Sequence, residues 1–423
     1  MRIVGSSVLK KNFFEYKELA DVAAVRTIIS GVIKNRDEAV RYYTTMFDGC
    51  TIEETRIDEG EIEAAYSNID KDVAGALQSA LENIKQFSRK QLEQFENFEF
   101  EIAPGVIVGQ KVTPIERVGI YVPGGRFPLV STLLMCAIPA QVAGVKEIAL
   151  CSPPRFKESI HPLILAACGM CGIKEAYRIG GVQAIAAMAY GTQTVKKVDK
   201  IVGPGNRFVT QAKKEVFGIT GIDFVAGPTE ILIIADESAH ADVVAADLLA
   251  QAEHDTEAVP ILVTVSRMIA EGVNKEVDLQ LNGLATRDIA KESIENNGII
   301  ILVKDIDEAI DIANKKSPEH LQLHVKDPVQ YIDKLISFGS LFVGEHSAEA
   351  LGDYSAGINH TLPTNTCARY TAGLGVKDFI KLQTTLKVGK KGLDKIGPVA
   401  RILASTEGLD GHARSIAKRL ERI

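Results

Sequence analysis

The chain has 423 residues, of which 46% are hydrophobic and 24% are charged, and its formal net charge is −7. A chain of this length is too long for one compact core, so we expect two to four domains. The acidic balance argues against a protein that binds nucleic acid, because such a protein would need a basic face.

The N-terminus lacks the features of an export signal, since charged residues interrupt it from the start and no small-residue cleavage site follows. The most apolar stretch, residues 127–145, contains Pro139 and several polar residues. We therefore predict a buried helix that ends near the proline, and not a membrane span. A cytoplasmic protein without a membrane partner is expected.

Six cysteines are scattered along the chain, and Cys168 and Cys171 form a CxxC pair. Such a pair can be redox-active or can supply half of a zinc site. This pair lies in an apolar Ala/Gly run and no second CxxC exists. Both observations favour a buried structural pair in a reducing compartment.

Two sequence patterns follow one another along the chain. Residues 22–47 and 61–98 carry apolar residues at helical spacing among many charges, which predicts two helices. From about Gly105, short β-branched runs appear, each followed by Gly/Pro residues and then by a helical pattern. This alternation predicts an α/β fold with parallel sheets and helices on their faces.

The predicted strands form two series. The first comprises residues 118–122, 147–151, 176–179 and 200–202. The second comprises residues 230–235, 259–265, 298–303 and 340–343, with helices at 239–252 and 306–315. The last fifty residues return to basic, helix-like sequence. Small helical segments are therefore expected at the two ends of the chain.

Three glycine-rich loops follow predicted strands: PGG at 123–125, GG at 180–181 and GPGN at 203–206. An open α/β sheet places ligand groups in loops at the carboxyl ends of its strands. Glycine allows close approach of a backbone to a ligand, and exposed amides suit phosphate. None of the loops has the GxGxxG fingerprint, and turn glycines that serve geometry alone explain each loop equally well.

Gln251 and His254 lie three residues apart near the end of a predicted helix, so their side chains share one face. Histidine is a common zinc ligand, whereas glutamine is an uncommon one. Hydrogen bonds to a neighbouring loop would satisfy both side chains equally well. The pair by itself therefore leaves metal binding open.

Glu319 and His320 follow Pro318 in a short segment between a predicted helix and an alternating Leu-Gln-Leu-His-Val run. Histidine titrates nearest neutrality, and a desolvated glutamate is raised toward the same range. Adjacent residues on an extended turn point in different directions and can serve two proton transfers. A helix N-terminus with Glu319 in its first turn is an equally good interpretation.

Two further segments offer a carboxylate together with an imidazole. Asp353 and His360 lie in a glycine-bracketed polar loop, and Glu407 and His412 lie near the C-terminus. Each pair alone fits a capped turn. Together with Gln251 and His254, they supply enough nitrogen and oxygen donors for a zinc site.

At these residues the sequence resembles the histidinol dehydrogenase family, from about Arg117 to His412. Many ordered blocks carry the resemblance, which makes it far more specific than any one motif. They are VGIYVPGG, LLMCAIPAQVAGV, GGVQAIAAMAYGT, VGPGNRFVTQAKKEVFG, GIDFVAGPTEILIIAD, DLLAQAEHD, SPEHLQL, GDYSAGINHTLPT and EGLDGHARS.

The resemblance implies specific ligand contacts. A zinc ion that orients the substrate is implied at Gln251, His254, Asp353 and His412. Substrate contacts are implied at Thr229, Gln251, His254, His320, Asp353, His360, Glu407 and His412. NAD contacts are implied at Tyr121, Gln183 and Asn206, on a Rossmann-like domain without the usual fingerprint.

The resemblance also implies a reaction. L-histidinol would be oxidised by four electrons to L-histidine through the bound aldehyde, with two NAD⁺ reduced in turn, in the last steps of histidine biosynthesis. His320 would accept the proton in both oxidations, and Glu319 would activate the water that attacks the aldehyde. Zinc would anchor the far end of the substrate.

The expected domains are two Rossmann-like parallel-sheet domains with terminal segments. Residues 21–115 and 226–372 would form the first α/β domain, which carries the zinc and catalytic residues. Residues 116–225 would form the second, which contacts NAD. Residues 1–20 would be an N-terminal segment, and residues 373–423 would cross to a partner in a homodimer. Glu407 and His412 would then complete the partner's site.

The sequence departs from the family's pattern at several places. Thr229 stands where many relatives have serine, and residues 345–348 replace a more usual Thr-Pro. The first hundred residues carry little signal of the family.

One alternative function is that of a related zinc dehydrogenase of another small alcohol, such as a sulfonated diol, but Glu407 suits a cationic amine and repels a sulfonate. Another is a zinc-stabilised binding protein without activity, which the Glu319–His320 pair argues against.

Overall fold

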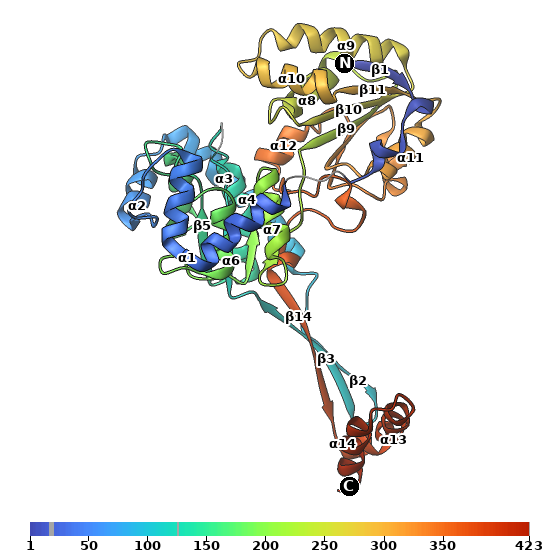
Figure 1. Cartoon of the computed structure of the whole chain (residues 1–423). Helices are drawn as coiled ribbons and strands as arrows, with labels where there is room; N and C mark the ends of the chain where they lie inside the picture. Colours follow the sequence, from blue (N-terminus) through green and yellow to red (C-terminus); the bar gives the residue numbers. More distant parts are fainter. Residues whose placement is uncertain (17–20, 125–126, 423) are drawn as a thin grey trace.

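Two parallel sheets and one antiparallel sheet organise this protein, and the computed structural model describes residues 1–16, 21–124 and 127–422. Figure 1 shows two α/β lobes and a long tail that carries the C-terminus. We name the lobe with the six-stranded sheet the first lobe and the lobe with the five-stranded sheet the second lobe. The predicted α/β class with parallel sheets is confirmed.

The first lobe is built on a parallel sheet with the strand order β1-β11-β10-β9-β12-β13. Its strands are β1 (Arg2–Gly5), β9 (Glu230–Ala235), β10 (Val259–Thr264), β11 (Ile299–Leu302), β12 (His320–His324) and β13 (Ser340–Val343). All six residues of β9 are buried, as expected for an apolar strand covered on both faces. The helices of this lobe are α8 (Ala241–Ala252), α9 (Arg267–Leu281), α10 (Arg287–Asn297), α11 (Ile306–Lys316) and α12 (Glu349–Tyr354).

The second lobe is built on a parallel sheet with the order β6-β5-β4-β7-β8. Its strands are β4 (Arg117–Tyr121), β5 (Glu147–Cys151), β6 (Glu175–Tyr177), β7 (Lys200–Val202) and β8 (Gly221–Ile222). Its helices are α1 (Val22–Asp48), α2 (Glu59–Ser67), α3 (Lys71–Leu92), α4 (Val130–Ala143), α5 (Pro162–Met170), α6 (Gly181–Tyr190) and α7 (Arg207–Val216). Apolar clusters fill both faces of this sheet.

The packing of the N-terminal elements differs from the expected division of the chain. Helix α1 packs on α6 and α7, α2 packs on α5, and α3 packs on α4, so residues 22–92 pack mainly on the second lobe. Strand β1 is no separate segment, because it pairs in parallel with β11 at the edge of the first sheet. The exposed charged faces of α1 and α3 carry no signal of which sheet their apolar faces cover.

The predicted helix over residues 61–98 is two helices. α2 ends at Ser67, and α3 begins at Lys71, where the Asp70 carboxylate accepts hydrogen bonds from the amides of Asp72 and Val73. Asp70 is thus an N-cap, which satisfies amides that a helix start leaves unpaired. Charged residues flank this junction on both sides, so the helical periodicity of the sequence does not reveal where one helix ends and the next begins.

The predicted end of a helix at Pro139 is wrong, because α4 continues to Ala143. A proline inside a helix deprives the carbonyl four residues earlier of its donor. Here the Asn359 side chain donates to the carbonyl oxygen of Met135 at 2.6 Å and replaces the lost hydrogen bond. This contact also fixes the loop after α12 of the first lobe against α4 of the second.

The tail consists of an antiparallel sheet and two helices. Its elements are β2 (Phe98–Ala103), β3 (Val106–Pro114), β14 (Ile380–Val388), α13 (Lys390–Thr406) and α14 (Asp410–Leu420). The C-terminal segment was expected to be helical, but it begins with β14, which pairs with β3 from Ile380 to Val388. The alternation in IKLQTTLKV suits a strand, and its partner lies more than 250 residues earlier in the chain.

Within the described ranges, no helix is long and apolar enough to cross a membrane. All six cysteines are free and buried. Burial raises the pKa of the Cys168 thiol and raises that of Cys171 to about 12, so neither is a reactive thiolate near neutral pH. The structural interpretation of the CxxC pair agrees with this burial.

Candidate active site

Segments of the first lobe bring the predicted side chains to one edge of its sheet. Thr229 precedes β9, Glu319 precedes β12, and His320 is the first residue of β12. Gln251 lies in the last turn of α8, which runs back from the carboxyl end of β9 toward the start of the strands. The site therefore lies at the amino edge of this sheet, and the expectation of a carboxyl edge is wrong for this lobe.

A sharp chain reversal delivers Glu319 and His320 to this edge. Helix α11 ends at Lys316 because Ser317 adopts a left-handed conformation with φ 52° and Pro318 cannot continue the helix. β12 then starts at His320, where it pairs with Ile231 of β9 and Ser340 of β13. The alternative interpretation as a helix N-terminus is therefore wrong.

The Glu319 carboxylate is enclosed and held at one oxygen. Its Oε2 accepts a hydrogen bond from the Thr229 hydroxyl at 2.6 Å and from the amide of Glu230 at 2.9 Å. Burial raises the pKa of Glu319 to about 8, and these two hydrogen bonds oppose the shift. Once it is deprotonated, a carboxylate with such a pKa is a stronger base than an ordinary glutamate and can take a proton from water.

The His320 imidazole is buried as a neutral base. Its Nδ1 lies 3.2 Å from the carbonyl oxygen of Glu230, which can only accept, so Nδ1 carries the proton and Nε2 keeps its lone pair. Nε2 has no hydrogen-bond partner among the described residues. Burial lowers the pKa of His320 to about 3 in this state, which keeps the ring uncharged. Nε2 is therefore free to accept a proton from a bound molecule.

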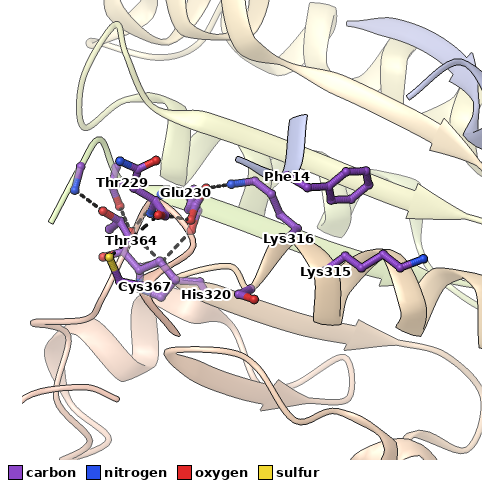
Figure 2. A network of polar contacts seen from close by, with 12 residues as sticks. Phe14, Thr229, Glu230, Lys315, Lys316, His320, Thr364 and Cys367 are labelled. Carbon is purple, nitrogen blue, oxygen red and sulfur yellow. Dashed lines mark hydrogen bonds and ion pairs between the residues drawn. The ribbon is translucent and has the colours of Figure 1, made fainter. Parts of the chain in front are cut away.

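A buried ion pair behind the site fixes the start of β9. The Lys316 ammonium group pairs with the Glu230 carboxylate, whose other oxygen accepts from the amide of Asn365 at 3.1 Å. Figure 2 shows Lys316 and Glu230 meeting beside Thr229 and His320. Because the Glu230 backbone contacts both Glu319 and His320, this pair holds the catalytic candidates in register. The sequence signal for this ion pair is Glu230, an acidic residue at the head of the apolar run EILIIA.

A group of metal-ligand atoms lies beside His320. Ligand atoms of His254, Glu349 and Asp353 all lie within 4.8 Å of one another. Gln251 is fully buried, and its amide nitrogen donates to the Thr229 hydroxyl at 2.7 Å, while its Oε1 has no partner among the described residues. The imidazole of His254 and the unpartnered oxygens of Gln251 and Asp353 are donors of the kinds that fit a zinc ion.

Glu349 is a site residue that the sequence analysis missed. It begins α12 four residues before Asp353, so both carboxylates project from one helix face. Their spacing was the available signal, but the polar loop predicted around Asp353 began at Gly352 and did not include Glu349. The unusual residues 345–348 before it form the turn into α12, and Asp353 keeps its place in the site.

His360 connects the site with the second lobe. Its Nδ1 lies 3.0 Å from the carbonyl oxygen of Asp353, and its Nε2 lies 3.3 Å from the hydroxyl of Thr132 on α4. Burial lowers the pKa of His360 to about 4, so the ring is neutral. A side chain that contacts both lobes positions the site at their boundary.

Glu407 and His412 are not brought together with the other predicted residues in this chain. Glu407 follows α13 and His412 lies in α14, both are exposed, and Figure 1 places these helices at the far end of the tail. The site of one chain therefore contains Glu319, His320, Gln251, His254, Asp353 and His360 but lacks the two tail residues.

The three candidate cofactor residues surround the carboxyl edge of the second sheet. Tyr121 ends β4, and its hydroxyl accepts from the amide of Gly181 at 3.1 Å. Gln183 is fully buried, and neither polar atom of its amide has a hydrogen-bond partner among the residues that the structure describes. Asn206 caps α7 through hydrogen bonds from the amides of Phe208 and Val209. The first glycine loop extends to Gly125, which lies outside the described residues.

The order of strands in the second sheet reverses between β4 and β7. Ligands of open α/β sheets bind in the crevice outside the carboxyl ends of the strands at such a point. The loops after β4 and β7 border it, and Gly203 is required there, because its φ is 112° and an added Cβ would lie 2.1 Å from the carbonyl oxygen of Tyr121. For this lobe the carboxyl-edge expectation agrees with the arrangement of the loops.

The fold and this site are those of a two-lobed α/β dehydrogenase. The model of the histidinol dehydrogenase family matches residues 14–420, so the chain belongs to that family of oxidoreductases. The match includes most of the first hundred residues, in which little signal of the family was recognised.

Individual relatives agree with this assignment. The chain is 47% identical to a histidinol dehydrogenase of Lactiplantibacillus plantarum over 94% of this chain and 92% of the relative. It is 44% identical to one of Methanothermobacter thermautotrophicus over 98% and 99% of the two chains. The crystal structure of histidinol dehydrogenase from Elizabethkingia anophelis superimposes with a TM-score of 0.94 at 39% identity, covering 100% of this chain and 98% of that one.

Proposed function

We propose that this protein oxidises L-histidinol to L-histidine through the bound aldehyde, in two successive oxidations that reduce two NAD⁺. The observation that carries the proposal is a neutral His320 with a free Nε2 beside Glu319, whose pKa is raised to about 8. The names of the relatives supply the substrate. Such a biosynthetic enzyme with free, buried thiols suits the reducing cytoplasm.

The unpartnered donors beside His320 would hold the metal. Gln251, His254 and Asp353, with His412 of the partner subunit, are the proposed ligands. Zinc bound there would anchor the amino and imidazole nitrogens of the substrate and so position its alcohol carbon. This leaves the hydroxyl end of the substrate for His320 and Glu319.

The two side chains would move protons at different stages. NAD⁺ bound at the second lobe would supply the hydride acceptor for both oxidations. His320 Nε2 accepts the hydroxyl proton in the first oxidation and the proton of the hydrated aldehyde in the second. Between the two oxidations, Glu319 takes a proton from a water molecule as the oxygen of that water attacks the aldehyde carbon. The hydrogen bond from Thr229 orients the Glu319 carboxylate for this step.

The direct test is NADH formation by pure, zinc-loaded protein with L-histidinol. We expect two NADH for each histidinol consumed and L-histidine as the product. A loaded sample that forms no NADH with this substrate contradicts the proposal. A sulfonated diol is the comparison substrate, and we expect it to be inactive because Glu407 repels a sulfonate. NADH formation with L-histidinol would also rule out the alternative that the chain is a zinc-stabilised binding protein without catalytic activity.

Replacing Glu319 with Gln is expected to stop the reaction at the aldehyde. NADH formed per histidinol should fall from two toward one, and aldehyde oxidation should slow by roughly 10²–10⁴-fold. A base acts unprotonated, so wild-type aldehyde oxidation should rise with pH through about 8, where Glu319 titrates, and then level off. Initial rates with the aldehyde across this range measure both effects. An unchanged pH profile in the variant would contradict the role of Glu319.

A buried ion pair under the GPGN loop predicts a role for Lys213 in cofactor binding. Its ammonium group pairs with Asp223 and donates to the carbonyl oxygen of Gly203 at 2.9 Å, while the Asp223 carboxylate accepts from the Gly203 amide at 2.8 Å. Both side chains are almost fully buried. The pair therefore holds Gly203 of this loop from both sides of its peptide backbone.

Lys213→Met should lower the free energy of unfolding by about 3–5 kcal/mol, because Asp223 stays buried without its cation. Adding Asp223→Asn should recover part of this loss, as measured by denaturant unfolding. In the double variant the KM for NAD⁺ should remain raised, because the carbonyl of Gly203 is no longer held, whereas the KM for histidinol should stay near the wild-type value. An unchanged KM for NAD⁺ would separate this loop from the cofactor.

The exposed tail supports a homodimer in which each tail completes the partner's site. Apolar side chains are exposed along it, including Phe98, Phe100 and Ile102 on β2 and Ile402 and Leu403 on α13. Side chains of this kind on one extended segment mark a surface for another protein chain. A second copy would cover them and bring Glu407 and His412 to the site.

A further inference from the structure

The loop that follows α12 is docked on the second lobe before it reaches His360. On α3, the Asn83 side chain donates to the carbonyl oxygen of Ser355 at 2.8 Å. Gly357 passes close to the same helix, because an added Cβ would lie 2.6 Å from the carbonyl oxygen of Asn83. Its φ of 89° is a conformation that favours glycine. The path of this loop is therefore set by a helix of the other lobe.

The loop then contacts α4 at two neighbouring residues. The Asn359 side-chain amide donates to the carbonyl oxygen of Met135 at 2.6 Å. The Nε2 atom of His360 lies 3.3 Å from the hydroxyl of Thr132, while its Nδ1 lies 3.0 Å from the carbonyl oxygen of Asp353. Thr132 and Met135 are three residues apart, so they lie on one face of the helix. His360 is thus held between α12 of its own lobe and α4 of the other.

Pro139 leaves the docking point on α4 open. It is buried inside the helix, four residues after Met135, and it has no amide hydrogen to donate to the Met135 carbonyl. An amide at this position would draw that carbonyl back into the hydrogen bonds of the helix and away from Asn359. Proline is the least favourable residue in a helix interior. Its place beside the loop that carries His360 therefore indicates a use other than helix stability.

We propose that Pro139 is a positioning residue for His360. It frees the Met135 carbonyl, Asn359 binds that carbonyl, and the adjacent imidazole is thereby held where the substrate binds. The proposal rests on the proposed function, in which His360 contacts L-histidinol. It means that the second lobe places a substrate-binding side chain of the first lobe in addition to binding NAD⁺.

Pro139→Ala returns an amide to the helix and is the direct test. We expect kcat/KM for L-histidinol to fall by about 10–100-fold, chiefly through a raised KM, because a small displacement of a binding group costs that much. The KM for NAD⁺ should stay near the wild-type value. The denaturant midpoint of unfolding should stay at or above that of the wild type, because alanine is a far better helix former than proline. A purely structural role would lower activity and stability together.

Asn359→Ala removes the other half of the contact and does not depend on how well Pro139→Ala folds. It should lower kcat/KM by a similar factor. Because both substitutions act through one hydrogen bond, Pro139→Ala/Asn359→Ala should be no less active than Asn359→Ala alone. Steady-state kinetics with L-histidinol on the wild type and the three variants measure this coupling.

Two substitutions serve as matched controls. Gln141→Ala lies on the same helix and removes a side-chain hydrogen bond to the carbonyl oxygen of Cys171, within the second lobe. Asn297 is half-buried like Asn359, and Asn297→Ala removes a side-chain hydrogen bond to the carbonyl oxygen of Thr256. Neither contact involves the loop that carries His360. We expect kcat/KM near the wild-type value in both controls.

An unchanged kcat/KM in Pro139→Ala would overturn the proposal, and so would losses that multiply in the double variant. Lower activity together with a lower denaturant midpoint would make Pro139 a structural residue and would also overturn it. A crystal structure of Pro139→Ala needs no reaction. We expect Asn359 to have left the Met135 carbonyl and His360 to have left Thr132, and an unmoved loop would contradict the proposal. If the wild type does not oxidise L-histidinol, the proposed function fails, whereas this crystal structure still decides whether Pro139 places His360.

Discussion

His320→Gln is expected to lower kcat for L-histidinol by roughly 10²–10⁴-fold while the zinc content stays at the wild-type level. The substitution removes the Nε2 lone pair that accepts the proton in both oxidations. It leaves the proposed metal ligands in place, because His320 is fixed by β12 and by the Glu230 carbonyl and not by the metal. Steady-state kinetics and metal analysis of the same sample measure the two quantities.

The matched control for this variant is His324→Gln. His324 lies on the same strand, is buried to the same degree as His320, and its Nε2 is 3.4 Å from Asp247 of α8. It carries the same cost of replacing a buried imidazole with an amide but lies four residues from the site. We expect near-normal kcat in this control. Near-normal turnover in His320→Gln, or loss of its zinc, would contradict the role assigned to His320.

Two inactive variants are expected to restore activity when they share a dimer. His320→Gln damages the lobe side of the site, whereas Glu407→Ala/His412→Ala damages the tail side. If each tail completes the partner's site, a mixed dimer has one intact site and one doubly damaged site. Random mixing of equal amounts should then give about a quarter of the wild-type activity. Co-expression with two affinity tags and assay of the mixture measures this gain.

The control for the mixing experiment combines two damages on the lobe side. A mixed dimer of His320→Gln and His254→Ala has one damaged residue in each site, so no site is intact. We expect no gain of activity from this pair. Absence of a gain with the tail variant as well, in mixed dimers shown to form by tag purification, would mean that each site is completed without the partner's tail.

The sequence predicted most of the sheet strands because their apolar runs carry a local signal. β5, β7, β9 and β13 have the predicted bounds, and each is a short β-branched or leucine-rich run. Two predictions of helix boundaries were wrong, each for a different physical reason. Asp70 divides a continuous helical pattern into two helices because it caps the start of α3. Asn359 allows α4 to continue past Pro139 because it donates a hydrogen bond to the carbonyl that the proline leaves without a donor. The second contact joins residues more than 200 positions apart, so no local pattern contains it.

Part of the candidate site was also predictable. Glu319, His320, Gln251, His254, Asp353 and His360 were named from residue type and family resemblance, and the structure brings them to one edge of the first sheet. Glu349 was missed because its place in the site depends on how α12 is buried against the other donor residues. The edge of the sheet was misjudged because the direction of α8 and the reversal at Ser317 decide where those side chains emerge.

By itself, the sequence determined the α/β class, the family and the chemical types of the site residues, because periodicity and residue identity are local properties. The tertiary structure alone decided which lobe α1–α3 cover, that β14 completes the tail, and that Glu349 lies beside Asp353 and His254. It also decided the protonation behaviour of Glu319 and His320. Their pKa shifts arise from burial among residues distant in sequence, and burial is a property of the folded chain.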